Sequence, residues 1–305
     1  MQSTRRSNAE RGFTLVEILV ASTITLSALA TTGLFFTLAR KTISDQLLQI
    51  ETLQGLRAAM DSMTRDLRLG GACLPTTGDF ITLDAAHGPP DSIFTRTGLV
   101  RPNETCIRTT TTTDTAASAT TISVVSANGF AVGMRAYIIQ ANGTSGEVFT
   151  VTGLNTSSNP NTLSKTTNFT CTGTCPSPAY PAASGIYALD ERRYAIDTSN
   201  SALPVLTLAA NGGTAAPFVF GIENMVIQYQ LDRNCDKPAV AISGAPEIPA
   251  TGCDVVTLPA STEFALVNSI YVTITARSRA TNSRGQYFRF TRTVAAKPRN
   301  LLPGG

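Results

Sequence analysis

The clearest pattern along the chain is a run of apolar and small residues from Ile18 to Ala39 that contains no charged side chain. As an α-helix, at about 1.5 Å per residue, this run would be roughly 33 Å long, close to the thickness of the bilayer hydrocarbon. A single carboxylate, Glu17, stands just before the run, and Arg40 and Lys41 follow it. The pattern predicts a membrane-spanning helix that begins with an isolated acidic residue.

Apolar residues continue beyond this run at helical steps of three and four. They are Ile43, Leu47, Ile50, Leu53, Leu56, Met60, Met63 and Leu67. Leu69-Gly70-Gly71 then supplies the glycine stop that is common at helix C-termini. We therefore expect one helix over residues 14–69, whose second half packs on a globular head. Thr31-Thr32-Gly33 combines β-branched residues with a glycine, which favours a local break in this helix.

From Thr82 onward the chain changes to short runs rich in β-branched residues, separated by Gly, Pro, Asn and Thr. We predict strands at residues 93–96, 121–125, 135–140, 147–152, 185–194, 218–231, 269–277 and 287–294. Residues 116–181 carry their own strands and a proline-rich exit, so we expect an inserted β-rich module between the head segments 70–115 and 182–305. The predicted class is α+β: a long N-terminal helix, transmembrane and then amphipathic, packed on an antiparallel β-sheet head.

A short, charged leader that ends in glycine precedes the apolar run, in the sequence Arg11-Gly12-Phe13-Thr14-Leu15-Val16-Glu17. An ordinary secretory signal has a shorter apolar core and a small-residue cleavage site after it. A plain membrane anchor explains the length of the run, but neither Glu17 nor the Gly12–Phe13 junction. An ionised group in hydrocarbon costs on the order of 3 kcal/mol, so Glu17 requires a dedicated partner. The segment resembles the class III signal peptide of type IV pilins and type II secretion pseudopilins.

This resemblance implies a leader at residues 1–12 that prepilin peptidase removes after Gly12, followed by N-methylation of Phe13. Glu17 would pair with the N-terminal amine of a neighbouring subunit during assembly. The helix would then cover residues 13–69, with 13–39 in the membrane. The implied precursor is a single-pass inner-membrane protein with its head in the periplasm, which later moves to a pilus at the cell surface. The implied partners are prepilin peptidase, other major and minor pilins, and the inner-membrane assembly platform.

Three further segments resemble PilW-type minor pilins: residues 58–73, where an Arg-Asp-Leu-Arg run ends the long helix, residues 221–232 and residues 291–300. In the last segment, Lys297-Pro298 departs from the usual spacing. The resemblance implies a minor pilin that supports assembly near the pilus tip. Two alternatives stay open, a minor pseudopilin of a type II secretion system and a receptor for DNA or surfaces at the tip.

The formal net charge is +3, and most of it lies in the leader, so the mature chain would be nearly neutral. Global charge therefore does not favour nucleic acid as a partner. Locally, Arg284, Arg289 and Arg292 alternate with aromatic residues near the C-terminus and are candidates for binding DNA through phosphates and stacking. The alternative, which we favour, is that these cations discourage edge-to-edge pairing of an exposed strand.

The six cysteines fit an oxidising compartment, where an even number favours disulfides. Proximity favours the pairs Cys73–Cys106, Cys171–Cys175 and Cys235–Cys253. A zinc site is disfavoured because the chain has no CxxC pair and His87 is its only histidine. Asp232, Asn234 and Asp236 stand at alternate positions, as calcium ligands do, but the turn glycine and the distal glutamate of a calcium loop are missing.

No set of residues in the sequence has the pattern of a catalytic site. A Ser-His-Asp or Cys-His system would need His87, which stands in a loop-like Ala-His-Gly-Pro-Pro segment. Neither a P-loop nor a dinucleotide-binding fingerprint occurs. We therefore expect a structural subunit that is not an enzyme and needs no cofactor.

Overall fold

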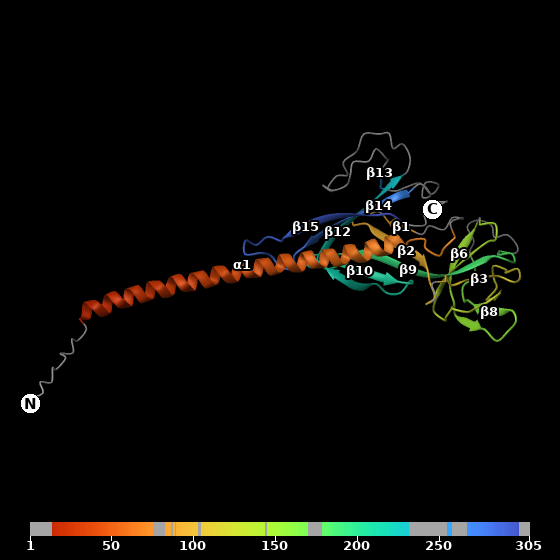
Figure 1. The fold of residues 1–305 in the computed structure, drawn as a ribbon, viewed down its shortest axis with the longest axis horizontal. Helices are drawn as coiled ribbons and strands as arrows, with labels where there is room; N and C mark the ends of the chain where they lie inside the picture. The colour runs from red at the N-terminus through yellow and green to blue at the C-terminus, as the bar shows by residue number, and fades with distance from the viewer. Residues whose placement is uncertain are drawn as a thin grey trace, which may run out of the picture.

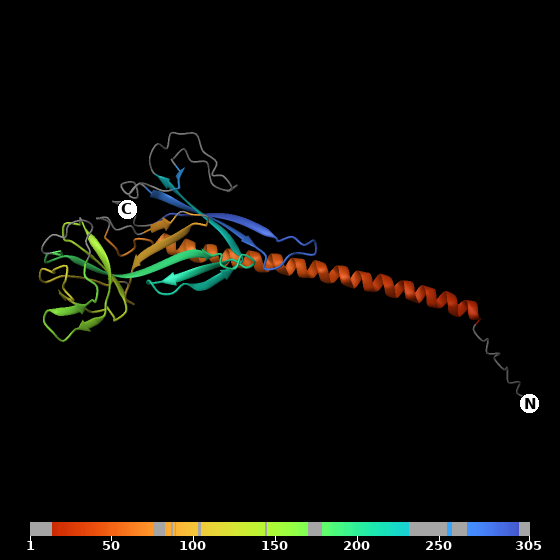
Figure 2. The ribbon, with the colours of Figure 1, turned by 180° about the vertical axis from the view of Figure 1, so that it is seen from behind.

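The computed structural model describes residues 14–75, 83–86, 88, 90–102, 105–143, 145–169, 179–231, 255–257 and 267–298. In these residues the chain forms one long helix and three antiparallel β-sheets, which confirms the predicted α+β class. Figure 1 shows the N-terminal half of the helix extending far from a β-rich head. The same head, seen from behind in Figure 2, is built around the C-terminal half of the helix.

The helix α1 (Leu15–Leu69) contains 55 residues and is about 82 Å long at about 1.5 Å per residue. It begins after Thr14, whose side-chain oxygen accepts a hydrogen bond from the amide of Glu17 at 3.3 Å. It ends at Gly70, whose amide donates to the Leu67 carbonyl at 3.2 Å. The helix ends at the predicted residue 69, because the glycine stop is a local signal, and it begins one residue after the predicted position 14.

The expected break at Thr31-Thr32-Gly33 is wrong, since α1 is continuous through these residues. The Thr31 hydroxyl lies 3.0 Å from the Ser27 carbonyl oxygen and 2.9 Å from that of Ala28, and the Thr32 hydroxyl donates to Ala28 at 2.7 Å. Hydroxyls that bond to the preceding turn leave no polar group that needs water. Gly33 costs only about 1 kcal/mol relative to alanine, which is too little to interrupt so long a helix.

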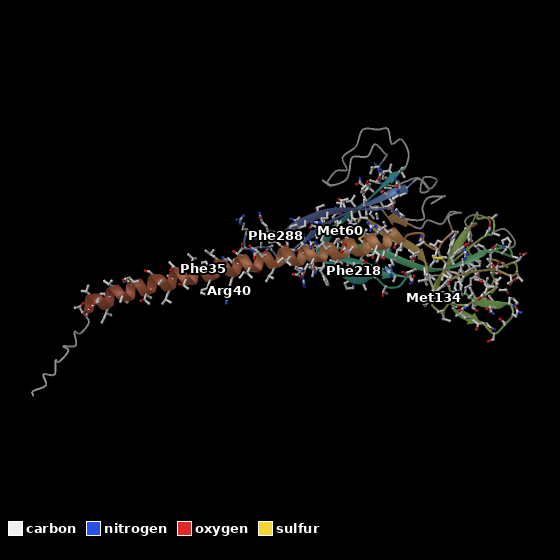
Figure 3. The ribbon with its side chains drawn as sticks, in the orientation of Figure 1. Phe35, Arg40, Met60, Met134, Phe218 and Phe288 are labelled. Atoms are coloured by element: carbon white, nitrogen blue, oxygen red, sulfur yellow. A yellow bond between two sulfur atoms is a disulfide. The ribbon has the colours of Figure 1, made fainter. Side chains whose placement is uncertain are left out.

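The amphipathic half of α1 packs on the head over a shorter distance than the sequence predicts. Leu56, Met60, Met63 and Leu67 are buried. Ile43, Leu47 and Ile50 are 55%, 61% and 51% exposed, so the expectation that they pack on the head is wrong. Burial begins at Thr52, which is 8% exposed, because the sheets reach along α1 only to this level. Figure 3 shows this division, with Phe35 and Arg40 on the free part of the helix and Met60 among the strands.

The strands form three sheets. The largest sheet has the order β1-β2-β9-β10-β11, with β3 and β5 also paired to β9, and β6 paired to β5. Its strands are β1 (Leu83–Ala86), β2 (Ser92–Gly98), β3 (Arg108–Thr110), β5 (Arg135–Ile139), β6 (Gly146–Thr150), β9 (Gly185–Asp197), β10 (Val205–Ala210) and β11 (Ala216–Phe220). The second sheet has the order β13 (Val255–Val256), β12 (Ile222–Leu231), β14 (Val267–Arg277) and β15 (Arg289–Ala296). The third has the order β4 (Thr121–Val124), β8 (Asn161–Ser164) and β7 (Gly153–Asn155).

Among the described residues, the two largest hydrophobic clusters organise the head. The first joins the buried face of α1 to β12 and β14 and to Tyr194 and Leu206 of the large sheet. The second takes buried residues from Ile107 to Ala188, so it extends beyond the expected insert at both ends. The long strand β9 connects the clusters, because its first half pairs with β3 and β5 and its second half with β2 and β10. The β5–β6 hairpin of the expected insert therefore shares a sheet with the head.

The strand predicted over residues 218–231 is in fact two strands, β11 and β12, that belong to different sheets. The chain changes sheet at Gly221, which has φ of 82°. A Cβ atom at Gly221 would lie 2.5 Å from the carbonyl oxygen of Arg277, so a side chain there would collide with the backbone of β14. The position thus needs glycine both for its left-handed conformation and for the close approach.

Candidate functional site

Glu17 lies in the first turn of α1, three residues after the capping residue Thr14. Negative charge is stabilised at this position by the unpaired amides and the dipole of the helix N-terminus. Among residues 14–39 it is the only charged residue. Its neighbours Leu15, Val16 and Ile18 are 78%, 67% and 60% exposed, so the carboxylate stands alone on an apolar surface.

The whole apolar part of α1 is free of the head. It is long and apolar enough to cross a membrane. Its most apolar stretch of 18 residues has a mean hydropathy of 1.8, and none of that stretch is buried in the fold. Its hydroxyls donate to helix carbonyls three or four residues back, for example Ser22 to Leu19 at 2.9 Å and Thr25 to Ala21 at 2.8 Å. A helix that satisfies its own polar groups and exposes apolar side chains is suited to lipid or to packing against other helices.

Several predicted site residues lie outside the described part of the chain. These are Gly12 and Phe13 at the cleavage junction, the cysteines Cys171, Cys175, Cys235 and Cys253, and the calcium candidates Asp232, Asn234 and Asp236. Their roles stay predictions. Within the described residues, no group of three or more His, Cys, Asp or Glu side chains is placed to hold a metal ion.

Comparison with protein families matches residues 7–32 to the prokaryotic N-terminal methylation motif. The match covers the Gly12–Phe13 junction, Glu17 and the first 15 of the 22 residues of the apolar run. Together with the long, exposed apolar helix, it supports a type IV pilin-like protein. Comparison with curated proteins and with solved structures finds no match to the chain.

For a pilin-like precursor, the motif implies processing by prepilin peptidase and assembly with other pilins, and the apolar helix supports anchoring in a membrane. Families that carry this motif are structural rather than enzymatic. In the described residues, the long helix α1 is packed into the head at its C-terminal end and is free of the head at its N-terminal end. The free part carries the motif, and the head holds the helix in place.

One predicted cysteine pair lies wholly in the described residues, and it forms a disulfide. Cys73 follows the end of α1, and Cys106 precedes β3, with Cα atoms 5.5 Å apart. The bond closes a loop with a sequence separation of 33 residues, for which chain entropy predicts a stabilisation of about 3–4 kcal/mol. It joins the helix C-terminus to the part of the head that carries the second hydrophobic cluster.

The three DNA candidates are not brought together on one face. Arg289 and Arg292 are three positions apart on β15, so their side chains leave opposite faces of the strand. Arg292 lies on the same face of β15 as Phe290 and Val294, which pack against the first cluster. On the other face, the Arg289 guanidinium pairs with Glu223 at 2.8 Å. Arg284 lies in the loop between β14 and β15. β15 is the edge strand of its sheet, the position at which cations discourage pairing with another chain.

Sequence reasoning missed a buried polar network that joins α1 to β9. Asp66 is 5% exposed and accepts from the Tyr194 hydroxyl at 2.5 Å. The Arg192 guanidinium approaches both carboxylate oxygens of Asp66 at 3.2 Å. Because the Tyr194 proton points to Asp66, the Ser62 hydroxyl donates to Tyr194 at 3.0 Å. These contacts link residues more than 120 positions apart in the sequence, so no local sequence pattern predicts them.

The network makes the stability of the head sensitive to alkaline pH. Burial, together with the hydrogen bond to Asp66, raises the pKa of Tyr194 to about 12. Since an unfolded tyrosine has a pKa of about 10, the stabilisation is complete below pH 10 and is lost as pH rises toward 12. We expect the free energy of unfolding to fall by about 2 kcal/mol over this range through Tyr194.

This pH dependence can be measured by urea unfolding of the detergent-solubilised chain at several pH values, followed by circular dichroism. Tyr194→Phe removes the ionisation, so its stability should decline less steeply between pH 10 and 12. Tyr271, whose pKa burial also raises, serves as the comparison through Tyr271→Phe, which keeps the Tyr194 contribution. Equal slopes for the parent chain and Tyr194→Phe would contradict the assignment.

A second set of contacts missed by sequence reasoning lies where α1 enters the head. The loop between β14 and β15, residues 278–288, reaches along the helix toward its N-terminus (Figure 1). Ser283 donates its amide and hydroxyl to the two carboxylate oxygens of Asp45, at 2.9 and 2.7 Å. The Arg279 guanidinium pairs with Glu51 at 3.2 Å. The loop is thus fastened to the helix on the membrane side of the sheets.

Proposed function

We propose that this chain is a PilW-like minor pilin, which prepilin peptidase cuts between Gly12 and Phe13 and which is then assembled into a type IV pilus. The observation that carries the proposal is the N-terminal methylation motif at residues 7–32, set on a helix whose apolar half is wholly exposed. An exposed apolar helix with one carboxylate at its start is suited first to a bilayer and then to a bundle of similar helices. The role is structural, without catalysis or a cofactor.

In this proposal the precursor crosses the inner membrane once, and the head lies in the periplasm before the subunit joins the pilus at the cell surface. The Glu17 carboxylate pairs with the methylated amine of Phe13 on a neighbouring major or minor pilin, at the inner-membrane assembly platform. The resemblance of residues 58–73 to PilW-type minor pilins supports a place near the pilus tip, where the subunit supports the start of assembly.

Processing is the first test. We expect mass spectrometry of the assembled protein to show a chain that begins at N-methylated Phe13. The peptidase recognises the glycine junction before the apolar run, so Gly12→Leu should keep the leader and the precursor mass. Glu10→Gln, which changes leader charge but not the junction, is the control and should be processed normally. An intact leader in assembled protein, or cleavage after Ala39, would contradict the proposal.

Incorporation of the subunit into a type IV pilus is tested in the native host. A tagged full-length chain should be found in sheared pili, with the label concentrated at their ends, and deletion of the gene should reduce the number of pili. Loss of protein secretion with normal piliation would instead identify a type II secretion pseudopilin.

A further inference from the structure

Of the head segments that the structure describes, the loop between β14 and β15 lies closest to the membrane segment. Figures 1 and 2 show it extending past the ends of the other strands along α1. Its contact with Asp45 fixes its height on the helix. Asp45 is six residues after Ala39, the end of the charge-free run, so the contact lies about 9 Å beyond it at about 1.5 Å per residue.

This height corresponds to the outer boundary of the lipid headgroups. A bilayer is about 40–45 Å thick with its headgroups and about 30 Å without them, so each headgroup layer is about 5–8 Å deep. With residues 18–39 in the hydrocarbon, Arg40 and Lys41 stand inside the headgroup layer. The loop stands directly above it, within the reach of an arginine side chain.

The charges at this height are mostly positive. Three cations, here called the basic collar, are Arg40 and Lys41 on α1 and Arg284 on the loop. One carboxylate, Asp45, lies beside them on the helix, which leaves a net charge of two positive units. In the described part of the chain, Asp45 is bound by Ser283 and is not matched to Arg284, whereas Arg279 pairs with Glu51, about 18 Å beyond Ala39 and above the headgroup layer.

Arg284 stands on an ordered turn at the tip of the loop. Asn282 accepts hydrogen bonds through its side-chain oxygen from the amides of Arg284 and Gln286, at 2.9 and 3.0 Å. Gly285 follows with φ of 76°, a left-handed conformation that glycine adopts without strain. The side chain of Arg284 is exposed. The turn therefore holds a solvated cation in place without binding it to the head.

We propose that the basic collar binds the anionic phospholipid headgroups of the periplasmic leaflet while the precursor is anchored in the inner membrane. The proposal rests on membrane anchoring of α1, whereas it is independent of whether the subunit joins a pilus or a secretion system. DNA fits this surface less well, because Arg289 is paired with Glu223 and Arg292 leaves the opposite face of β15. Contact with lipid would hold the head at a set height above the bilayer.

The test uses the full chain in nanodiscs of phosphatidylcholine, with or without phosphatidylglycerol. A photo-crosslinking benzoylphenylalanine replaces Gln286, which is exposed at the loop tip, and Ser157, exposed in the β7–β8 turn, is the control position. We expect lipid adducts at position 286 only, with a several-fold higher yield in the anionic discs. The difference should disappear at about 1 M salt, where the Debye length is about 3 Å.

Arg284→Gln should reduce the anionic-disc adducts about fivefold, since one basic residue at such a surface contributes about 1 kcal/mol. Arg68→Gln is the matched control. It makes the same charge change at an exposed site about 35 Å further along α1 and should have no effect. Equal adduct yields in both lipids, or an equal loss in both variants, would overturn the proposal. A chain that fails to co-purify with nanodiscs would refute the membrane anchoring, and the lipid contact with it.

Discussion

Replacing Glu17 with valine is expected to leave leader cleavage intact and to reduce incorporation of the subunit into fibres at least tenfold. The junction that the peptidase recognises is unchanged, and the apolar segment becomes easier to insert. What is lost is the carboxylate that pairs with the N-terminal amine of a neighbour. In hydrocarbon a charge without a partner costs on the order of 3 kcal/mol, which exceeds the roughly 1.4 kcal/mol that a tenfold loss requires.

The measurement is the ratio of the subunit in sheared fibres to the processed subunit in membranes, for cells that express each variant. Glu51→Val is the matched control, because it makes the same substitution on the same helix. Glu51 is about half exposed and pairs with an equally exposed Arg279, an arrangement that contributes at most about 1 kcal/mol. We expect Glu51→Val to assemble nearly normally.

A second substitution separates charge from size. Glu17→Gln keeps the shape and the hydrogen-bonding oxygen but removes the negative charge, so we expect it to assemble as poorly as Glu17→Val. Incorporation of Glu17→Val at the level of the parent chain would remove Glu17 from the assembly mechanism. Normal incorporation of Glu17→Gln alone would assign its role to a hydrogen bond and not to an ion pair.

The features that could be predicted from the sequence are those set by the spacing of apolar residues along one element or by residues at the end of that element. The apolar run, the helical spacing that follows it and the Gly70-Gly71 stop define α1 without reference to the head. The β-rich runs predict the strands at residues 185–194 and 269–277, which the structure contains within β9 and β14. The Cys73–Cys106 disulfide also follows from proximity, since both cysteines flank a single short segment of chain.

What could not be predicted depends on contacts between distant residues. The apolar stripe of α1 continues to Ile43, but only tertiary structure decides that the sheets end near Thr52. The sequence predicts the run 218–231 as one strand, and it does not show that Gly221, where the chain changes sheet, lies against the backbone of Arg277. The strand β9 joins two hydrophobic clusters through partners on both of its sides, an arrangement that alternation along one strand does not encode.

In the candidate site, too, some residues can be recognised from the sequence and others only from the folded structure. Glu17 is recognisable because a lone carboxylate in an apolar run is conspicuous in the sequence itself. Asp66 and Asp45 look like ordinary charges on the polar face of a helix. Their functions arise from Tyr194 and Arg192 in one case and from Ser283 in the other, residues that reach them only in the folded chain.

Replacing Asp66 with alanine should lower the free energy of unfolding of the head by about 2–4 kcal/mol. The substitution leaves the Arg192 guanidinium and the buried Tyr194 hydroxyl without their shared acceptor. Breaking a fully buried ion pair costs about 3–5 kcal/mol. The lower range applies here because the Arg192 side chain is 34% exposed and keeps part of its hydration.

Urea unfolding of the detergent-solubilised chain, followed by circular dichroism, measures this loss. Asp61→Ala is the matched control, since Asp61 lies on the exposed face of the same helix and its replacement should change stability by less than about 0.5 kcal/mol. The double variant Asp66→Leu with Arg192→Met replaces both charges by apolar groups and should recover part of the loss, because the buried Arg192–Asp66 pair is then removed as a whole, although the partly exposed Asp190 loses its contact with Arg192 at 3.1 Å. If Asp66→Ala were as stable as Asp61→Ala, the network would not be what fixes the end of α1 to β9. The rigid junction between helix and head would then depend on the hydrophobic cluster and the Cys73–Cys106 disulfide alone.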